Sequence, residues 1–206
     1  MISAVNLTKT FDNVAVVSNF SITINKQDFI AITGESGSGK TTILNMLGLL
    51  EKPDRGEITV DGIANPSRKE QLLLQRHKFG YLFQNYALIE NETVEENLKI
   101  ALEYRKGVIK KNLMKEALHF VNLSSAFLEK KIYQLSGGEQ QRVAIARLYL
   151  KEADYILADE PTGNLDKKNR DIVFSLLKKL NEMGKAVVFV THDVELAEKA
   201  RQWVKL

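Results

Sequence analysis

The sequence contains no cysteine and only three prolines among 206 residues. Without cysteine the chain can form neither a disulfide framework nor a thiolate metal site, and it fits a reducing compartment. A composition of 44% hydrophobic and 27% charged residues, with so little proline, excludes disordered and collagen-like chains. This length predicts one domain, or one domain with an inserted subdomain, around a core that needs no covalent staples.

A long apolar run and a strong excess of one charge are also missing. The longest apolar stretch, residues 43–50, is far shorter than the ~20 residues that a membrane-spanning helix needs. The first residues lack the basic start and apolar run of a secretory signal. The net charge of +3 is too small and too scattered to indicate nucleic-acid binding. We therefore expect a soluble protein without a nucleic-acid partner, which reaches a membrane only through another protein.

Apolar strands and amphipathic helices alternate along much of the chain. Near the start, alternating segments such as SITI at 21–24 predict half-exposed strands of an antiparallel layer. The alternation favours an α/β fold with a mostly parallel sheet covered on both faces, which binds ligands beyond the carboxyl ends of its strands. The buried strands and covering helices are predicted, in chain order, at 28–33, 41–50, 155–159, 167–182 and 186–191.

Residues from about 92 to 150 change from strand-like to helical patterning. Val94, Leu98 and Leu102 share one helical face, and Ala117 and Leu118 lie together on another. We therefore expect a single domain over 1–206, with a core formed by 1–91 and 151–206 and a helical subdomain at about 92–150.

The segment GESGSGKT at 34–41 stands between a predicted strand and a predicted helix, as a phosphate-binding loop requires. Backbone N–H groups at such a helix start form a cradle for anions. Lys40 is expected to reach the β- and γ-phosphates, and the Thr41 hydroxyl to hold Mg²⁺. A merely tight turn is the alternative, which this placement disfavours. The residues expected to bind a nucleoside triphosphate here are Gly34, Glu35, Ser36, Gly37, Ser38, Gly39, Lys40, Thr41 and Thr42.

The apolar strand YILAD ends in two carboxylates, Asp159 and Glu160. Asp159 is expected to hold Mg²⁺ through water, and Glu160 to orient or deprotonate an attacking water. Helix-capping acids before Pro161 are the alternative for this pair. The form N-K-x-D at 25–28 resembles the guanine-reading motif of GTPases, but it precedes the phosphate loop and is interpreted as a turn.

LSGGEQ at 135–140, followed by QRVAIARLYL, completes the set of motifs. With it the chain resembles the ATP-binding-cassette (ABC) ATPases over essentially all 206 residues. The segments ADEPTGNLD and YLFQNYALI are most similar to ATPases of the macrolide-export, lipoprotein-release and bacteriocin-export branch.

This resemblance implies further roles. Gln84 would form the Q-loop and contact Mg²⁺, Asp166 would close the D-loop at 163–166, and His192 would contact the γ-phosphate. Phe11 stands where the family stacks an aromatic ring on adenine, although Tyr is commoner there. The implied catalytic residues are Glu160, His192, Gln84 and Lys40; the implied metal ligands are Thr41, Gln84 and Asp159; and the signature residues, which bind the ATP of a partner chain, are Ser136, Gly137, Gly138, Glu139 and Gln140.

The residues themselves also support a second phosphate site. Ser136 and the two glycines after it start a helix and can offer a hydroxyl and bare N–H groups to an anion, although a simply capped helix is the alternative. One phosphate group cannot occupy both loops if the second belongs to a separate subdomain. A head-to-tail homodimer with ATP between the chains satisfies both.

The resemblance implies the ATPase subunit of an ABC transporter, with export following from the branch alone. A separately encoded integral-membrane permease would be its partner at the cytoplasmic face of the cell membrane, with a short permease helix in a groove near Gln84 and residues 86–88. A non-transport ABC ATPase, such as a cell-division-type mechanical regulator, is the alternative. DNA-repair relatives need a coiled coil for which residues 40–136 leave no room, and translation factors carry two cassettes. Intact Glu160 and His192 disfavour a regulator that binds nucleotide without hydrolysis.

Overall fold

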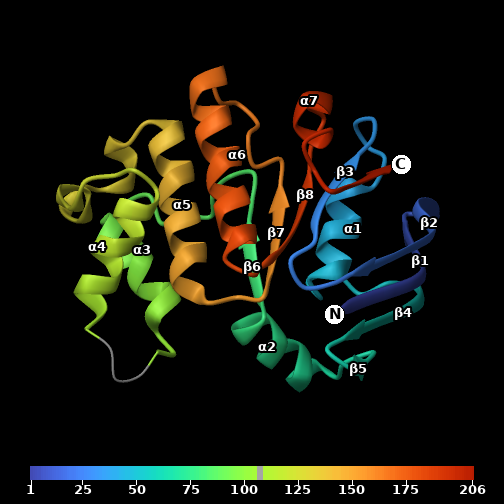
Figure 1. Cartoon of the computed structure of the whole chain (residues 1–206). Helices are drawn as coiled ribbons and strands as arrows, with labels where there is room; N and C mark the ends of the chain where they lie inside the picture. The colour runs from blue at the N-terminus through green and yellow to red at the C-terminus, as the bar shows by residue number, and fades with distance from the viewer. Residues whose placement is uncertain (106–108) are drawn as a thin grey trace.

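A five-stranded parallel sheet forms the centre of the protein in the computed structural model, which describes residues 1–105 and 109–206 (Figure 1). The strand order is β6-β7-β8-β3-β9, and each neighbouring pair is parallel. The strands predicted at 28–33, 155–159 and 186–191 are confirmed to within one residue. The bounds are β3 (Phe29–Thr33), β6 (Phe79–Leu82), β7 (Tyr155–Asp159), β8 (Ala186–Val190) and β9 (Gln202–Lys205).

A four-stranded antiparallel sheet forms a second layer, as the alternating segments near the start predict. Its order is β2-β1-β4-β5. The residues of the discounted GTPase-like motif form a turn into β3, in which the Asp28 carboxylate accepts a bond of 2.6 Å from the Asn25 N–H. The bounds are β1 (Ile2–Phe11), β2 (Val14–Ile24), β4 (Arg55–Val60) and β5 (Ile63–Ala64).

The parallel sheet is covered on both faces because its side chains alternate between two cores. Phe29 and Ala31 pack into the core beneath α5 (Gly137–Lys151) and α6 (Lys167–Glu182), whereas Ile30 and Ile32 pack toward α1 (Lys40–Leu47) and the antiparallel sheet (Figure 1). The prediction of a covered sheet is confirmed. Helix α1 ends three residues before the predicted end at 50, since Leu49 takes a left-handed φ of 61° and turns the chain away.

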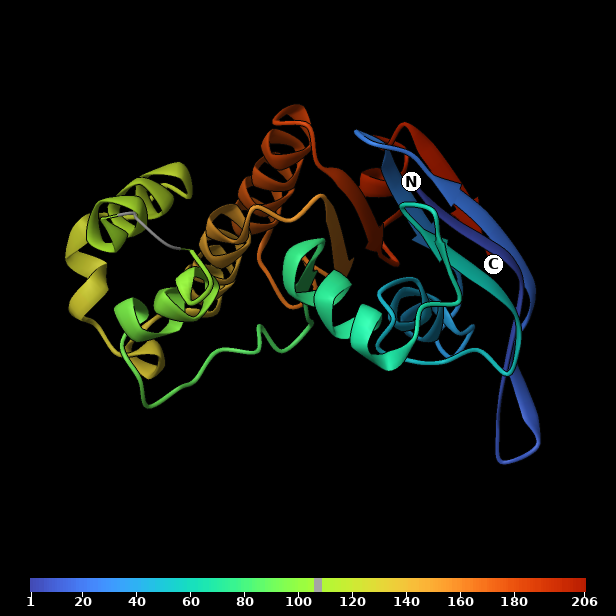
Figure 2. The same cartoon turned by 90° about the horizontal axis from the view of Figure 1, so that it is seen from below.

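Residues 94–105 and 109–134 contain short helices at one end of the protein, opposite the antiparallel sheet (Figure 2). Val94, Leu98 and Leu102 are fully buried in one core with Ala117 and Leu118, as their spacing predicts. Helix α5 runs on to Lys151 and also packs on β6 and α6. The subdomain boundaries at 92 and 150 stay a prediction. The helical elements are α3 (Val94–Lys99), η1 (Ile100–Leu102), α4 (Lys110–Phe120), η2 (Ser125–Glu129) and η3 (Ile132–Gln134).

Helix α2 (Arg68–His77) is an element that the sequence reasoning missed. Its start carries a capping box, in which the N–H and hydroxyl of Ser67 donate to the Glu70 carboxylate, and this box is visible in the sequence. A shorter helix, α7 (Val194–Ala197), follows β8. Within the described ranges, none of the helices combines the length and apolarity needed to cross a bilayer.

Candidate active site

The loop between β3 and α1 forms the floor of the site. Gly39 precedes α1 with φ of 86°, and a Cβ on it would lie 2.5 Å from the Val16 carbonyl oxygen, so only glycine fits. In the described part of the chain no side chain caps α1, and its first turn holds no acidic residue. The first N–H groups of α1 and the positive end of its dipole are therefore available to an anion.

The ammonium group of Lys40 is held over this loop by the loop's own backbone. It donates to the Gly34 oxygen at 3.0 Å and to the Glu35 oxygen at 2.7 Å. The turn itself is tightened by the Ser38 N–H, which donates to the same Glu35 oxygen at 3.2 Å. A cation fixed beside uncapped N–H groups is the arrangement expected for phosphate binding.

Asp159, the last residue of β7, meets the first turn of α1. The Thr41 hydroxyl donates to Asp159 Oδ1 at 3.2 Å. Burial raises the pKa of the Asp159 carboxyl above its ordinary value, and the Thr41 bond and the Lys40 charge offset part of this rise. Gln84 lines the same pocket. A hydroxyl, an amide oxygen and a buried carboxylate are hard oxygen donors of the kind that Mg²⁺ takes, so these residues fit the metal.

Glu160 and His192 face each other where β7 and β8 end. The Glu160 N–H donates to the Val190 oxygen at 3.1 Å, and its φ of 44° is left-handed, a conformation that costs a non-glycine residue about 1–2 kcal/mol. His192 Nδ1 lies 3.0 Å from Glu160 Oε2, an ion-pair distance without the alignment of a hydrogen bond. The Glu160 side chain is only 15% exposed, whereas that of His192 is 74% exposed. A largely buried carboxylate and an exposed imidazole thus share one wall of the pocket.

These groups line a single pocket of about 460 Å³ at the carboxyl ends of β3, β7 and β8. The position agrees with the general placement of ligand sites in open parallel sheets. The predicted site residues that the pocket brings together are Ser36, Gly37, Gly39, Lys40, Thr41, Thr42, Gln84, Asp159, Glu160 and His192. The lining residues that sequence reasoning missed as single positions are Val16, Gly163, Asn164 and Val190.

Phe11 does not line this pocket. It ends β1 with 45% of its surface exposed, and the Lys9 ammonium lies 5.2 Å from its ring centroid. Val16 of the adjacent strand β2 lines the pocket instead. No sequence signal marks Val16, because it belongs to an ordinary alternating strand. Stacking of Phe11 on adenine stays a prediction.

The signature residues 136–140, all of which the structure describes, lie outside the pocket at the start of α5. The Ser136 hydroxyl donates to Glu139 Oε2 at 2.8 Å and accepts from the Glu139 N–H at 3.4 Å, so the alternative of a capped helix is present in the structure. A Cβ on Gly138 would lie 2.6 Å from the Asn169 side chain. Gly138 therefore permits a close approach of α5 to α6.

Asn169 connects this helix start to the D-loop. Asp166 caps α6 by accepting from the Asn169 N–H at 2.9 Å, and the Asn169 amide donates to the second oxygen of Asp166 at 2.7 Å. Arg142 of α5 donates to Asn169 Oδ1 at 3.0 Å, and the buried Gln141 donates to the Pro161 oxygen. The segment after Glu160 is thus bonded to α5 at two points, which the sequence pattern did not indicate.

Comparison with known proteins identifies this arrangement. The profile of the ABC transporter family matches residues 17–163. The chain is 42% identical over 209 residues to the uncharacterized ABC transporter ATP-binding protein MJ0796 of Methanocaldococcus jannaschii, covering 96% of this chain and 89% of that one. It is 37% identical to the lipoprotein-releasing system ATP-binding protein LolD of Aquifex aeolicus, covering 100% and 93%.

Other relatives are longer proteins. The macrolide export ATP-binding/permease protein MacB of Campylobacter jejuni is 38% identical over all of this chain, which spans only 33% of MacB. Among solved structures, the dimeric MJ0796 cassette has a TM-score of 0.89 at 38% identity, covering 100% of this chain and 94% of that one. A post-hydrolysis state of the same cassette bound to ADP and Pi has a TM-score of 0.90 at 37% identity, with the same coverage.

These findings confirm the predicted fold class and the predicted assignment as an ATPase of a transporter, and none of these relatives supports the alternative of a mechanical regulator. The match covers the phosphate loop, the Q-loop, the signature and both carboxylates, Asp159 and Glu160. This chain belongs to the ABC transporter family and has the fold of its ATPase cassette.

Proposed function

We propose that this chain binds MgATP in the 460 Å³ pocket and hydrolyses it to drive a separate membrane permease. The observation that carries the proposal is the convergence, in this one pocket, of an uncapped helix start, a fixed lysine, two carboxylates and a histidine. The uncapped N–H groups of α1 and Lys40 would hold the phosphates, and Thr41, Gln84 and Asp159 would hold Mg²⁺.

Hydrolysis needs a positioned water and compensation of the charge on the transferred phosphoryl group. Glu160 would orient the water and accept its proton, because it lines the pocket and its Oε2 has no hydrogen-bond partner in the described chain. Lys40 and His192 would stabilise the developing charge from two sides. Bound Mg²⁺ would neutralise charge on the phosphate oxygens.

Two copies of the chain would close around two ATP molecules. The second phosphate-binding loop, at Ser136, does not reach this chain's own pocket, so a partner chain would have to supply it. ATP contacts both chains only in the closed state, and its binding would therefore favour closure. Both solved structures of the MJ0796 cassette are dimeric, and we transfer this assembly to the present chain.

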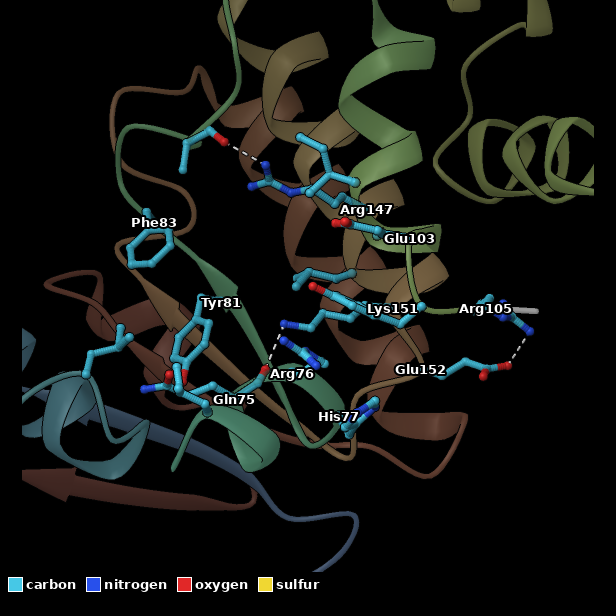
Figure 3. A pocket seen from close by; sticks show the side chains of 17 residues that line it. Gln75, Arg76, His77, Tyr81, Phe83, Glu103, Arg105, Arg147, Lys151 and Glu152 are labelled. Carbon is cyan, nitrogen blue, oxygen red and sulfur yellow. Dashed lines mark hydrogen bonds and ion pairs between the residues drawn. The ribbon is translucent and has the colours of Figure 1, made fainter. Parts of the chain in front are cut away.

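A groove of about 640 Å³ beside β6, η1 and α5 is our candidate for the permease contact (Figure 3). Its wall carries exposed apolar side chains, among them Leu72 and Tyr104, beside the cations Arg76 and Lys151. A short amphipathic helix would suit this mixture. The groove reaches Ala87, which lies within the segment that the sequence predicts for this contact. The chain would then act at the cytoplasmic face of the cell membrane, in an exporter of the macrolide, lipoprotein or peptide type.

The test is phosphate release by the purified chain with ATP and Mg²⁺. Lys40→Ala should abolish both nucleotide binding and hydrolysis, whereas Lys26→Ala, an exposed lysine outside the pocket, should leave both unchanged. The permease assignment is tested by co-purification from membranes with a multi-span protein. A wild-type chain that binds no ATP would contradict the proposed ATPase activity. An ATPase that neither co-purifies with a permease nor changes its rate with one would contradict the permease assignment.

A further inference from the structure

Two consecutive non-glycine residues, Tyr86 and Ala87, adopt left-handed backbone conformations just after Gln84. Their φ angles are 63° and 46°. The turn is tight, since the Tyr86 N–H donates to the Phe83 oxygen at 2.9 Å and the Ala87 N–H donates to the Asn85 oxygen at 2.7 Å. Neither side chain can compensate by bonding its own backbone as asparagine does. Such conformations persist only where the surroundings hold them, and they are concentrated at functional sites.

Arg147 of α5 is the group that holds this turn. Its guanidinium donates from Nη1 to the Ala87 oxygen at 2.6 Å (Figure 3). It also donates from Nη2 to the Tyr86 oxygen at 2.9 Å. The planar guanidinium presents two parallel donors, which match two successive carbonyl groups in a way that a lysine cannot. The half-buried position of Arg147 strengthens these bonds, because solvent competes less for them.

The same turn touches the start of α5 with its aromatic side chain. A Cβ placed on Gly137 would lie 3.4 Å from the Tyr86 hydroxyl, which is ordinary contact distance. Tyr86 is therefore bonded through its backbone to the middle of α5, and its hydroxyl lies near Gly137 of the signature residues. Gln84, just before Tyr86 and Ala87, lines the ATP pocket. Ala87 itself lines the groove beside Arg147.

We propose that Arg147 is a positioning residue, which holds the Tyr86–Ala87 turn so that the signature loop at Ser136–Gly138 is set to receive the ATP of a partner chain. The inference rests on the ATP-closed dimer of the proposed function. Loss of Arg147 frees the turn to leave the left-handed region, and the Tyr86 hydroxyl then no longer stays beside Gly137. Binding of the first ATP to this chain's own pocket does not depend on the turn, whereas closure with a second chain does.

The experiment measures ATP-dependent dimerisation by gel filtration in a Glu160→Gln background, in which slow hydrolysis keeps ATP bound. Adding Arg147→Gln should raise the ATP concentration for half-maximal dimer by about tenfold or more, as expected for loss of a paired, charge-assisted contact. The binding of a fluorescent ATP analogue to the monomer should stay unchanged. Ala87→Gly added to this variant should restore dimerisation, since glycine adopts the left-handed conformation without help.

Arg201→Gln is the matched control. Arg201 also donates to the backbone oxygen of a left-handed residue, Gln27, at 3.2 Å, but it lies outside both pockets and the signature. This variant should dimerise like the background. Equal dimerisation with and without Arg147, or a defect that comes with a lowered melting temperature and is not rescued by Ala87→Gly, would overturn the inference. A Glu160→Gln background that stays monomeric with ATP would instead overturn the proposed dimer itself.

Discussion

Glu160 Oε2 and His192 Nδ1 lie 3.0 Å apart, one at the end of β7 and the other just beyond β8. The strands are neighbours in the parallel sheet, so the two residues meet although 32 positions separate them in the sequence. The Glu160 side chain is largely buried and its backbone N–H donates to the Val190 oxygen, whereas the His192 side chain is exposed. We therefore expect the two residues to have separable roles, Glu160 toward the attacking water and His192 toward the developing charge.

Glu160→Gln should lower the rate of phosphate release by ~10²–10⁴-fold, because the amide keeps the shape of the side chain but cannot accept a proton from water. Nucleotide binding should persist, since the phosphate loop is untouched. Gel filtration with ATP and Mg²⁺ should then show a dimer that the wild type populates only transiently. Rapid hydrolysis by this variant, or a monomer at saturating ATP, would contradict the role given to Glu160.

His192→Ala should lower the turnover rate by about 100-fold with little change in KM, as for loss of one group that stabilises developing charge. In the proposed function the loop and Lys40 hold the ground-state phosphates, so binding should survive. His119→Ala is the control, since His119 is an exposed residue of α4 outside the pocket. If His192→Ala and His119→Ala hydrolyse ATP at the same steady-state rate, His192 has no part in the chemistry.

Much of this site could be predicted from the sequence because its parts are local. A phosphate loop is recognised by glycines between a strand and a helix. Asp159 and Glu160 are recognised by their place at the end of an apolar strand. Parallel strands bring their carboxyl ends to one edge, which is why Lys40, Asp159 and His192 meet. The parallel sheet, its helices and the helical segment after residue 92 follow from periodicity for the same reason.

What could not be predicted depends on contacts between layers. Val16 lines the pocket only because the antiparallel sheet lies over the phosphate loop. The bonds from Arg147 to the turn at 86–87 and from Arg142 to Asn169 join segments about 60 and 27 positions apart, without a spacing rule to reveal them. Helix α2 was missed since only Leu74 of it is buried, so its apolar periodicity is weak despite its capping box.

Asp159→Asn should stabilise the nucleotide-free chain and abolish its Mg²⁺-dependent stabilisation by ATP. Burial raises the pKa of Asp159 above its ordinary value of 3.8, so folding at neutral pH carries the cost of a buried negative charge. The uncharged amide avoids this cost and still offers an oxygen to the Thr41 hydroxyl. The melting temperature should rise by about 2–4 °C, the shift that roughly 1 kcal/mol produces in a domain of this size.

The pH dependence of this gain has a definite sign. Because the folded pKa lies above 3.8, the unfolded chain loses the Asp159 proton first as the pH rises, and wild-type stability falls across that window. The advantage of the variant should therefore grow as the pH rises from 3.8 through the folded pKa and level off at neutral pH. Calorimetry at several pH values tests this, and a variant that is less stable than the wild type at neutral pH would contradict it.

Gly138→Ala should destabilise the chain although alanine normally stabilises a helix. Its Cβ would lie 2.6 Å from the Asn169 side chain, which must then give up its bonds to Arg142 and Asp166. We expect a loss of about 1–3 kcal/mol in the free energy of unfolding, as for other overpacked contacts. In an Asn169→Ala background that obstruction is gone, and the same substitution should be neutral or stabilising by up to ~1 kcal/mol.

A double-mutant cycle of Gly138→Ala and Asn169→Ala, measured by urea unfolding, therefore tests whether the two residues interact. Gly137→Ala is the control, because its Cβ would meet only the Tyr86 hydroxyl at 3.4 Å, and it should cost little in either background. An equal cost of Gly138→Ala with and without Asn169 would show that the two residues do not interact, and the link between the signature helix and the D-loop would have to run through Gln141 and Pro161 alone.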